Sequence, residues 1–293
     1  MKITVTGSLG NISKPLTEIL IKAGHQVTVV SSSNDRAAEI TALGATPAIG
    51  LITDVDFLTK AFTGADVVYV MVPPYWATSD WKGYIASIGS NYAKAIKAAG
   101  VTKVVNLSSV GADLEDGTGP IAGLHRVEKI YNELEGVAVK HLRAGFFYTN
   151  FYANVDMIKH AGIIGNNFGA ETPLVIVHPR DIAVVVAEAL QSDFSGKSVR
   201  YVASDERTAG DVAKVLGAAI GKPELPWIEF SDEDNIKGAV GAGLPEEVAK
   251  NYTEMGASAR NGSMFADYNH NRPELGQIKL EDFAAEFAGA FKN

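Results

Sequence analysis

The sequence predicts an α/β protein, in which a doubly wound parallel sheet is joined to a smaller, interleaved C-terminal α/β region. Two observations predict this class. Short β-rich runs alternate with amphipathic stretches at a regular interval, which is the pattern of βαβ units. The alternation is interrupted after Phe151 and resumes near residue 176, so the chain is expected to leave the sheet and return to it.

Each element of the alternation has its own signal. The expected helices carry apolar residues at a helical period, and Gly24, Gly44 and Gly100 each follow one of them, where a left-handed C-cap is favoured. The expected strands lie near 2–6, 26–30, 46–49, 66–72, 103–107, 138–143 and 198–203. The expected helices lie near 12–23, 35–43, 55–62, 84–99, 123–134 and 179–191.

The division into regions follows from the same pattern. Residues 1–150 form the expected first domain, and 176–206 return to its sheet. Residues 151–175 and 207–293 carry more loop-forming residues and are expected to build a smaller substrate-binding or lid region.

Composition excludes several functional classes. The chain of 293 residues has 26 basic and 34 acidic side chains, and a net charge of -8 argues against direct binding of nucleic acid. It has no cysteine, which excludes disulfides and thiolate chemistry and fits a reducing, cytoplasmic location. No apolar run approaches the roughly 20 residues of a membrane span, no signal peptide is recognisable, and no histidine has the spacing of a metal ligand. A monomer and a homodimer both remain open.

A glycine-rich turn follows the first expected strand. It reads TGSLGNIS over residues 6–13, and an apolar helix comes next. Glycine permits the tight turn and the close approach of a pyrophosphate, whose charge then faces the free amides of the helix N-terminus. Ser13 occupies the third glycine position and is still small enough for close packing of helix on sheet. The turn therefore predicts a dinucleotide site on a Rossmann-type sheet.

The end of the second expected strand favours NADP over NAD. NAD binders place an acid there, about 20 residues after the glycines, on the ribose hydroxyls. This chain instead has Ser31, Ser32 and, slightly later, Arg36, which suit a 2′-phosphate. Asp35 lies close enough to keep NAD as the alternative.

Taken together, these motifs resemble the NmrA-like group of atypical short-chain dehydrogenases/reductases. That group contains quinone reductases, azoreductase-like enzymes and redox-sensing regulators. The resemblance spans nearly the whole chain. It rests on TGSLGNIS (6–13), VMVPPYW (70–76), VVNLSSVGA (104–112), HRVEK (125–129), LRAGFFYTNF (142–151) and VHPRDIA (177–183).

The resemblance implies a set of binding residues at the carboxyl ends of the strands. This chain departs from the family pattern at Leu51, where many relatives have an acid that helps to hold the adenine. The pyrophosphate would lie on Gly7, Leu9, Gly10, Asn11 and Ile12, and the adenosine phosphate near Ser31, Ser32 and Arg36. The nicotinamide half would lie near Val72, Pro73, Ser108 and Phe147.

The resemblance also implies where the chemistry would occur. Standard short-chain dehydrogenases use a Tyr-x-x-x-Lys pair, and this chain has His125 and Lys129 at the matching place. Side chains four apart share a helix face, so both are expected to point at the nicotinamide. Lys129 would hold the ribose hydroxyls, and His125 would either donate a proton or merely pack.

Several aromatic residues would complete the cleft. The set Tyr75, Trp76, Phe146 and Tyr148 predicts an apolar slot for a flat ring, such as a quinone-like substrate. The leading hypothesis is an NADPH-dependent reductase of such acceptors by direct hydride transfer. One alternative is a non-catalytic NADP(H)-binding redox sensor that acts through a protein partner, which the missing tyrosine supports. Another is an isoflavone-reductase-like or epimerase-like enzyme.

Overall fold

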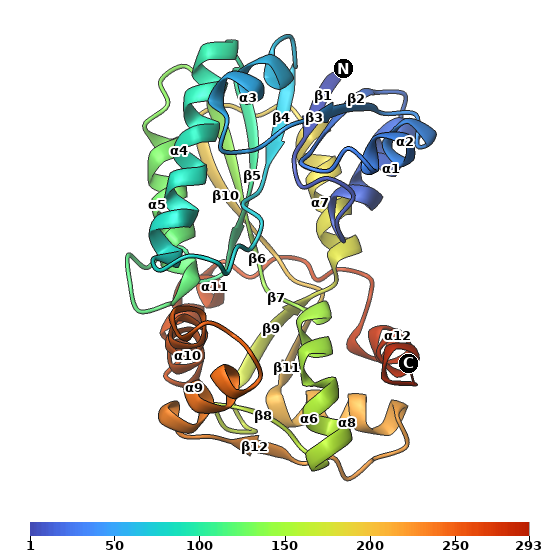
Figure 1. Cartoon of the computed structure of the whole chain (residues 1–293), viewed down its shortest axis with the longest axis vertical. Coiled ribbons are helices and arrows are strands. Elements are labelled where there is room, and N and C mark those ends of the chain that lie inside the picture. Colours follow the sequence, from blue (N-terminus) through green and yellow to red (C-terminus); the bar gives the residue numbers. More distant parts are fainter. Residues whose placement is uncertain (293) are drawn as a thin grey trace.

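A parallel sheet of seven strands forms the centre of the upper half of the molecule (Figure 1). The structure is a computed structural model that describes residues 1–292. The strand order is β10-β6-β5-β4-β1-β2-β3, with every pair parallel, so the predicted fold class is confirmed. The strands are β1 (Lys2–Val5), β2 (Gln26–Ser31), β3 (Thr46–Ile49), β4 (Val67–Val70), β5 (Lys103–Ser109), β6 (Ala138–Ala144) and β10 (Lys197–Val202).

Helices cover both faces of this sheet. One face packs on α1, α2 and α7, whose apolar residues share a core with β1, β2 and β6. The other face packs on α3, α4 and α5. These helices are α1 (Ser13–Lys22), α2 (Arg36–Ala42), α3 (Val55–Phe62), α4 (Trp81–Ala99), α5 (Pro120–Asn132) and α7 (Pro179–Gln191).

The helix ends follow the expected local chemistry. Gly24, Gly44 and Gly100 all have positive φ, of 82°, 88° and 69°, as predicted from their places after helical runs. At the N-termini, Asp54 accepts a hydrogen bond from Phe57 N, and Asp80 accepts one from Gly83 N. The cap at Asp80 begins α4 three residues before the expected helix.

The rest of the chain builds a second region below the main sheet (Figure 1). A three-stranded sheet has the order β11-β9-β7, and β12 pairs with β8. Its strands are β7 (Phe146–Phe147), β8 (Ile164–Asn166), β9 (Pro173–Val177), β11 (Asp205–Thr208) and β12 (Trp227–Glu229). Its helical elements are η1 (Tyr148–Asn154), α6 (Val155–Ala161), α8 (Ala209–Ala219), α9 (Asp232–Gly241), α10 (Glu246–Arg260), η2 (Ser263–Phe265), α11 (Ala266–His270) and α12 (Leu280–Lys292).

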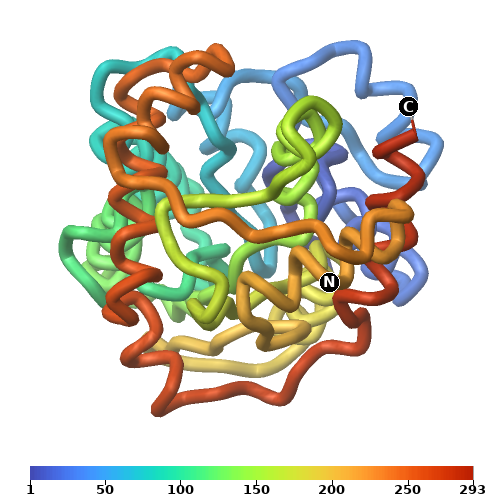
Figure 2. The backbone as a smooth tube through the Cα atoms, turned by 90° about the horizontal axis from the view of Figure 1, so that it is seen from below, coloured from blue at the N-terminus to red at the C-terminus, as the bar shows by residue number. Residues whose placement is uncertain are grey.

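The chain passes between the two regions several times. After β9 it returns to the main sheet with α7 and β10, and residues 271–279 later cross the molecule from α11 to α12 (Figure 2). The crossing segment is held by Asp181 at the start of α7, which accepts hydrogen bonds from Ser204 Oγ at 2.6 Å and Ile278 N at 3.1 Å. These bonds fix the second region beneath the carboxyl ends of the strands.

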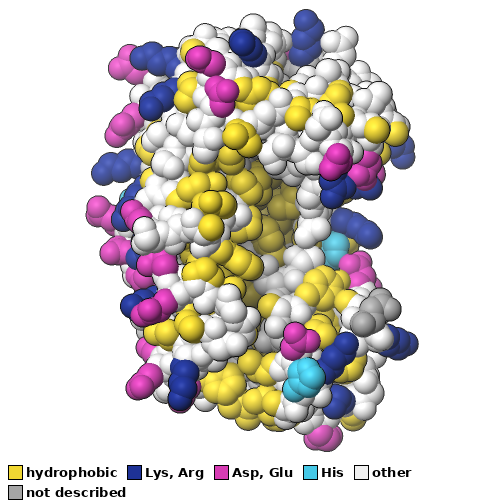
Figure 3. All heavy atoms as spheres, viewed as in Figure 1, with side chains coloured by type: hydrophobic (Ala, Val, Ile, Leu, Met, Phe, Trp, Pro, Cys, Tyr) yellow, Lys and Arg dark blue, Asp and Glu magenta, His cyan; other side chains and the backbone are white. Residues whose placement is uncertain are grey.

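The topology identifies where a ligand would bind. The order of the strands reverses between β1 and β4, and ligands of open α/β sheets bind beyond the carboxyl ends of the strands at such a point. A hollow lined with apolar side chains lies between the upper and lower halves of the molecule (Figure 3). Among residues 1–292, no helix is long and apolar enough to cross a membrane.

Candidate functional site

The glycine turn after β1 has the conformation that close approach of a ligand requires. Gly7 has φ 92°, and a Cβ on it would lie 2.6 Å from Ser13 Oγ, so only glycine fits there without displacement. Gly10 N donates to Gly7 O at 3.2 Å and closes the turn. Ser8 has φ 55°, an unusual value for a residue with a side chain and typical of constrained functional loops.

The turn leads directly into α1. Ser13, in the third glycine position, is buried and donates to Thr6 O at 2.8 Å, so serine packs here and adds a hydrogen bond. Ile12 is also buried in the core, which leaves only its backbone for a ligand. Within residues 1–292, no side chain caps the start of α1 and its first turn has no acid. Its free N–H groups therefore suit an anion.

The end of β2 closes the other side of the turn. Ser31 is buried, and its hydroxyl accepts hydrogen bonds from Ser8 Oγ at 2.9 Å and Ser33 N at 3.2 Å. Ser31 therefore positions the loop. Ser32 and Arg36 are exposed, and the Arg36 side chain, which pairs with Glu39 at 2.7 Å, retains 51% of its accessible surface. Leu51, in the position where many relatives have an acid, is 59% exposed.

A buried polar network lies at the ends of the neighbouring strands. Ser108 on β5 pairs in register with Arg143 on β6, and Arg143 with Tyr201 on β10. Ser108 Oγ donates to Glu128 Oε1 of α5 at 2.6 Å. Arg143 binds the same carboxylate through Nε at 3.0 Å and Nη2 at 2.7 Å. Two parallel bonds between charged groups give this pair a fixed geometry.

The network continues into the second region. Arg143 Nη1 donates to Asp267 of α11 at 3.1 Å and to the Tyr201 hydroxyl at 3.0 Å, and that hydroxyl also donates to Asp267. Asp113, whose carboxylate lies 3.7 Å from Arg143, has a pKa raised by burial. The network ties α11 to the main sheet beside the candidate nicotinamide position. No local pattern in the sequence predicts these contacts, because their residues are far apart in the chain.

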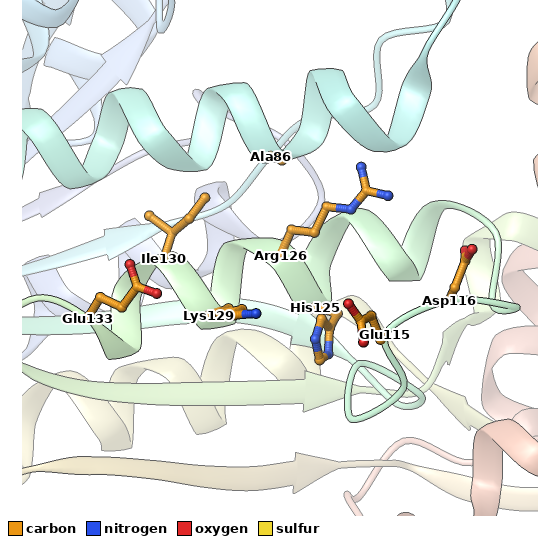
Figure 4. Close-up of a pocket in the computed structure, with 8 residues that line it drawn as sticks. All are labelled: Ala86, Glu115, Asp116, His125, Arg126, Lys129, Ile130 and Glu133. Carbon is orange, nitrogen blue, oxygen red and sulfur yellow. The ribbon is translucent and has the colours of Figure 1, made fainter.

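His125 and Lys129 do not join these residues. They line a pocket of about 490 Å³ beside α5, and Figure 4 shows both side chains on successive turns of the helix. His125 Nδ1 lies 2.9 Å from Ala112 O, and Lys129 is exposed. The pocket is lined by Ala86, Glu115, Asp116, His125, Arg126, Lys129, Ile130 and Glu133, of which His125 and Lys129 were predicted to face the nicotinamide.

The reason for this placement is the orientation of α5. Its buried stripe contains Ile121, Glu128 and Tyr131, with Glu128 facing the ends of the strands. His125 and Lys129 share a face, as the spacing requires, and both are less buried than Glu128.

The aromatic residues after β4 are open to solvent. Tyr75 is 46% and Trp76 44% exposed, and they follow Val72 and Pro73, both partly buried. The Tyr75 ring packs on Tyr84 of α4 at 4.8 Å between centroids. Two flat side chains are thus presented at the same edge of the sheet as the glycine turn.

The aromatic residues after β6 differ from one another. Phe146 and Phe147 are partly buried, and Phe146 packs 5.2 Å from Phe151. Tyr148 is fully buried, and its hydroxyl donates to Ile278 O at 3.2 Å. In this structure the segment 271–279 covers Tyr148, which therefore presents no exposed surface to a substrate.

No metal centre is evident. Within residues 1–292, no three His, Asp or Glu side chains gather closely enough to hold a metal ion.

Strand order and glycine turn together define a protein of the doubly wound, dinucleotide-binding Rossmann class. The profile of the NmrA-like family matches residues 1–264, and the chain belongs to that family. A curated relative, the uncharacterised protein C2A9.02 of Schizosaccharomyces pombe, is 40% identical over 68 residues. That match spans 23% of this chain and 23% of the relative.

Solved structures share the fold over almost the whole chain. The NADPH-dependent quinone oxidoreductase of Escherichia coli, in complex with NADPH, has a TM-score of 0.83 and 21% identity, covering 97% of this chain and 99% of its own. The triphenylmethane reductase of a Citrobacter species, in complex with NADP(H), has a TM-score of 0.80 and 21% identity, covering 98% and 99%. A nucleoside-diphosphate-sugar epimerase of Staphylococcus aureus has a TM-score of 0.80 and 15% identity, covering 97% and 100%.

Proposed function

We propose that this protein is an NADPH-dependent reductase of flat, conjugated acceptors such as quinones. The observation that carries the proposal is the exposed aromatic pair Tyr75 and Trp76, which follows β4 at the sheet edge that also bears the glycine turn. Aromatic rings offer apolar area and stacking to a planar substrate. The similarity to a quinone oxidoreductase and a triphenylmethane reductase supports the same class of acceptor.

The residues at the glycine turn fit a dinucleotide. Gly7 keeps the turn at a positive φ where a Cβ would meet Ser13, and the uncapped start of α1 provides amide donors for a pyrophosphate. Gly10 and Asn11 are exposed beside it. When bound, NADPH supplies a hydride and becomes NADP⁺.

The second strand supports NADP over NAD. It ends at Ser31 with no acid at its tip, and Ser32 and Arg36 are exposed just beyond it. A hydroxyl and a guanidinium suit a 2′-phosphate, whereas an acid would repel it.

The proton of the reduction is assigned to water. His125 Nδ1 faces the Ala112 carbonyl oxygen at 2.9 Å, and the Ser108 hydroxyl donates to Glu128. We therefore assign the proton transfer to neither His125 nor Lys129, and the chain's contribution is to bind and orient the two reactants. An acceptor that takes up a hydride can collect its proton from solvent without a protein acid.

The absence of a tyrosine from the segment HRVEK (125–129) favours a second candidate, a cofactor-binding redox sensor without turnover. The two candidates differ in whether any acceptor accelerates NADPH oxidation. Epimerase-like chemistry has no comparable support, since Glu128, the acid that Ser108 contacts, is already paired with Arg143.

The experiment is a screen of acceptors. Purified protein with NADPH is mixed with quinones, triphenylmethane dyes and enones, and oxidation is followed by nicotinamide absorbance. We expect at least one planar acceptor to accelerate oxidation.

Trp76→Ala should raise the KM for that acceptor by about threefold to tenfold, the range for a lost aromatic contact, without changing the Kd of NADPH. Val240→Ala, an exposed apolar residue on α9, is the control. Tight NADPH binding with no acceptor active would overturn the reductase and support the sensor.

A further inference from the structure

Two cations from different helices share one carboxylate beside the glycine turn. Lys14 lies in the first turn of α1, and its Nζ is 3.0 Å from Glu39 Oε1. Arg36 is the first residue of α2, and its Nη1 is 2.7 Å from Glu39 Oε2. Each cation thus takes a different oxygen of the same side chain.

These three side chains lie at the corner where the glycine turn meets the end of β2. Lys14 N donates to Gly10 O at 3.0 Å, and Arg36 N donates to Ser33 O at 3.2 Å, so both cations are anchored to the two loops of the candidate site. In dinucleotide-binding sheets this corner receives the 2′ position of the adenosine ribose.

The charges at the corner are accessible and do not cancel. The hydrogen bonds from Lys14 and Arg36 lower the pKa of Glu39, which is ionised at neutral pH. Within residues 1–292, Lys14 and Arg36 have no other ion-pair partner. The exposed fractions of the Lys14, Glu39 and Arg36 side chains are 45%, 39% and 51%, so an incoming anion can reach them. Two positive charges and one negative charge leave a net charge of +1.

We propose that Lys14 and Arg36 together bind the 2′-phosphate of NADP(H), and that Glu39 is a built-in competitor for that phosphate. This inference rests on the proposed function and assigns Lys14 and Glu39 roles that determine cofactor specificity. A phosphate dianion added to the three groups leaves the corner with one uncompensated negative charge. With glutamine at position 39 the same phosphate would be balanced, so the Glu39 charge opposes binding of NADPH.

The prediction for Glu39 therefore has an unusual sign. Glu39→Gln should lower the Kd of NADPH by about twofold to fivefold, the range expected for an exposed charge interaction, and leave the Kd of NADH unchanged. Lys14→Met should raise the Kd of NADPH by at least about threefold, again with no effect on NADH. Both differences should shrink in high salt, because exposed charges are screened.

The experiment measures the Kd of NADPH and NADH for each variant by calorimetry, in low and in high salt. Lys22→Met, at the other end of α1 and exposed, and Glu18→Gln, on the exposed side of α1, are the matched controls and should leave both constants unchanged. Thermal melting confirms that every variant is folded.

Two results would overturn the inference while leaving the proposed function intact. One is weaker NADPH binding by Glu39→Gln, which would make Glu39 a support for the cations instead of a competitor. The other is a Lys14→Met variant with unchanged NADPH binding or an equal loss for both cofactors. If the wild-type protein binds neither cofactor, the proposed function itself fails and this inference falls with it.

Discussion

His141 on β6 should make stability of the main sheet depend on pH. Its Nδ1 lies 3.1 Å from Asn106 Nδ2, and its Nε2 lies 3.0 Å from Asn132 Oδ1. A neutral ring with its proton on Nε2 satisfies both neighbours. A second proton would have to sit on Nδ1 facing the amide hydrogens of Asn106, in a buried position. Burial accordingly lowers the pKa of His141 from 6.5 to about 4.

The size and sign of the effect follow from this pKa. The difference between 6.5 and about 4, at roughly 1.4 kcal/mol for each pH unit, corresponds to about 3 kcal/mol. Because the folded state binds its proton less tightly than the unfolded state, this contribution is complete above about pH 6.5. It is lost as the pH falls through that value towards about 4.

The assay is urea unfolding between about pH 4 and pH 7.5 for the wild type and for His141→Gln, which cannot titrate there. The loss of free energy of unfolding on acidification should be about 3 kcal/mol smaller in the variant, since the carboxylates common to both proteins cancel in the difference. His160→Gln, at an exposed position on α6, is the control. If the free energies of unfolding of the wild type and of His141→Gln fall in parallel with pH, His141 does not have the lowered pKa.

Three further substitutions test the site. Glu128→Ala leaves Arg143 buried without its carboxylate and should lower the free energy of unfolding by at least about 3 kcal/mol in urea, whereas a loss under 1 kcal/mol would contradict the buried pair. Gly7→Ala places a methyl group 2.6 Å from Ser13 Oγ at a φ of 92°. It should raise the Kd of NADPH, measured by calorimetry, by about tenfold or more. An unchanged Kd would show that the glycine turn does not contact NADPH. Tyr148→Phe loses one hydrogen bond and should lower the free energy of unfolding by about 1 kcal/mol with kcat and KM unchanged. An altered KM would indicate that Tyr148 contacts the substrate.

The main sheet was predictable because its signals are local. Strands buried on both faces read as short apolar runs, as in β4 (Val67–Val70), and the helices between them show one apolar stripe. The second region lacks such signals. Its β7 has two residues and its β8 and β12 three each, so alternation cannot be recognised, and their pairing depends on contacts between distant parts of the chain.

The site was predictable in part for the same reason. The glycine turn is a single stretch of chain whose residues dictate their own conformation. The direction of His125 and Lys129 was not readable from their spacing, which shows that two side chains share a face but not where that face points.

The long-range contacts had no signal in the sequence. Glu128 and Arg143 belong to different elements, and nothing in either segment indicates that they meet. Lys14 and Glu39 likewise meet only because α1 and α2 pack on the same face of the sheet.

In the proposed reaction, a hydride passes directly from NADPH to an acceptor lying against Tyr75 and Trp76. The most direct measurement uses protein freed of flavin, NADPH carrying deuterium at one or the other of its two nicotinamide C4 positions, and a triphenylmethane dye that accepts hydride at carbon. We expect mass spectrometry to find one deuterium in the reduced dye with one of the two labelled cofactors and none with the other. Reduced dye without deuterium from either cofactor, or no reduction while NADPH binds, would contradict direct transfer.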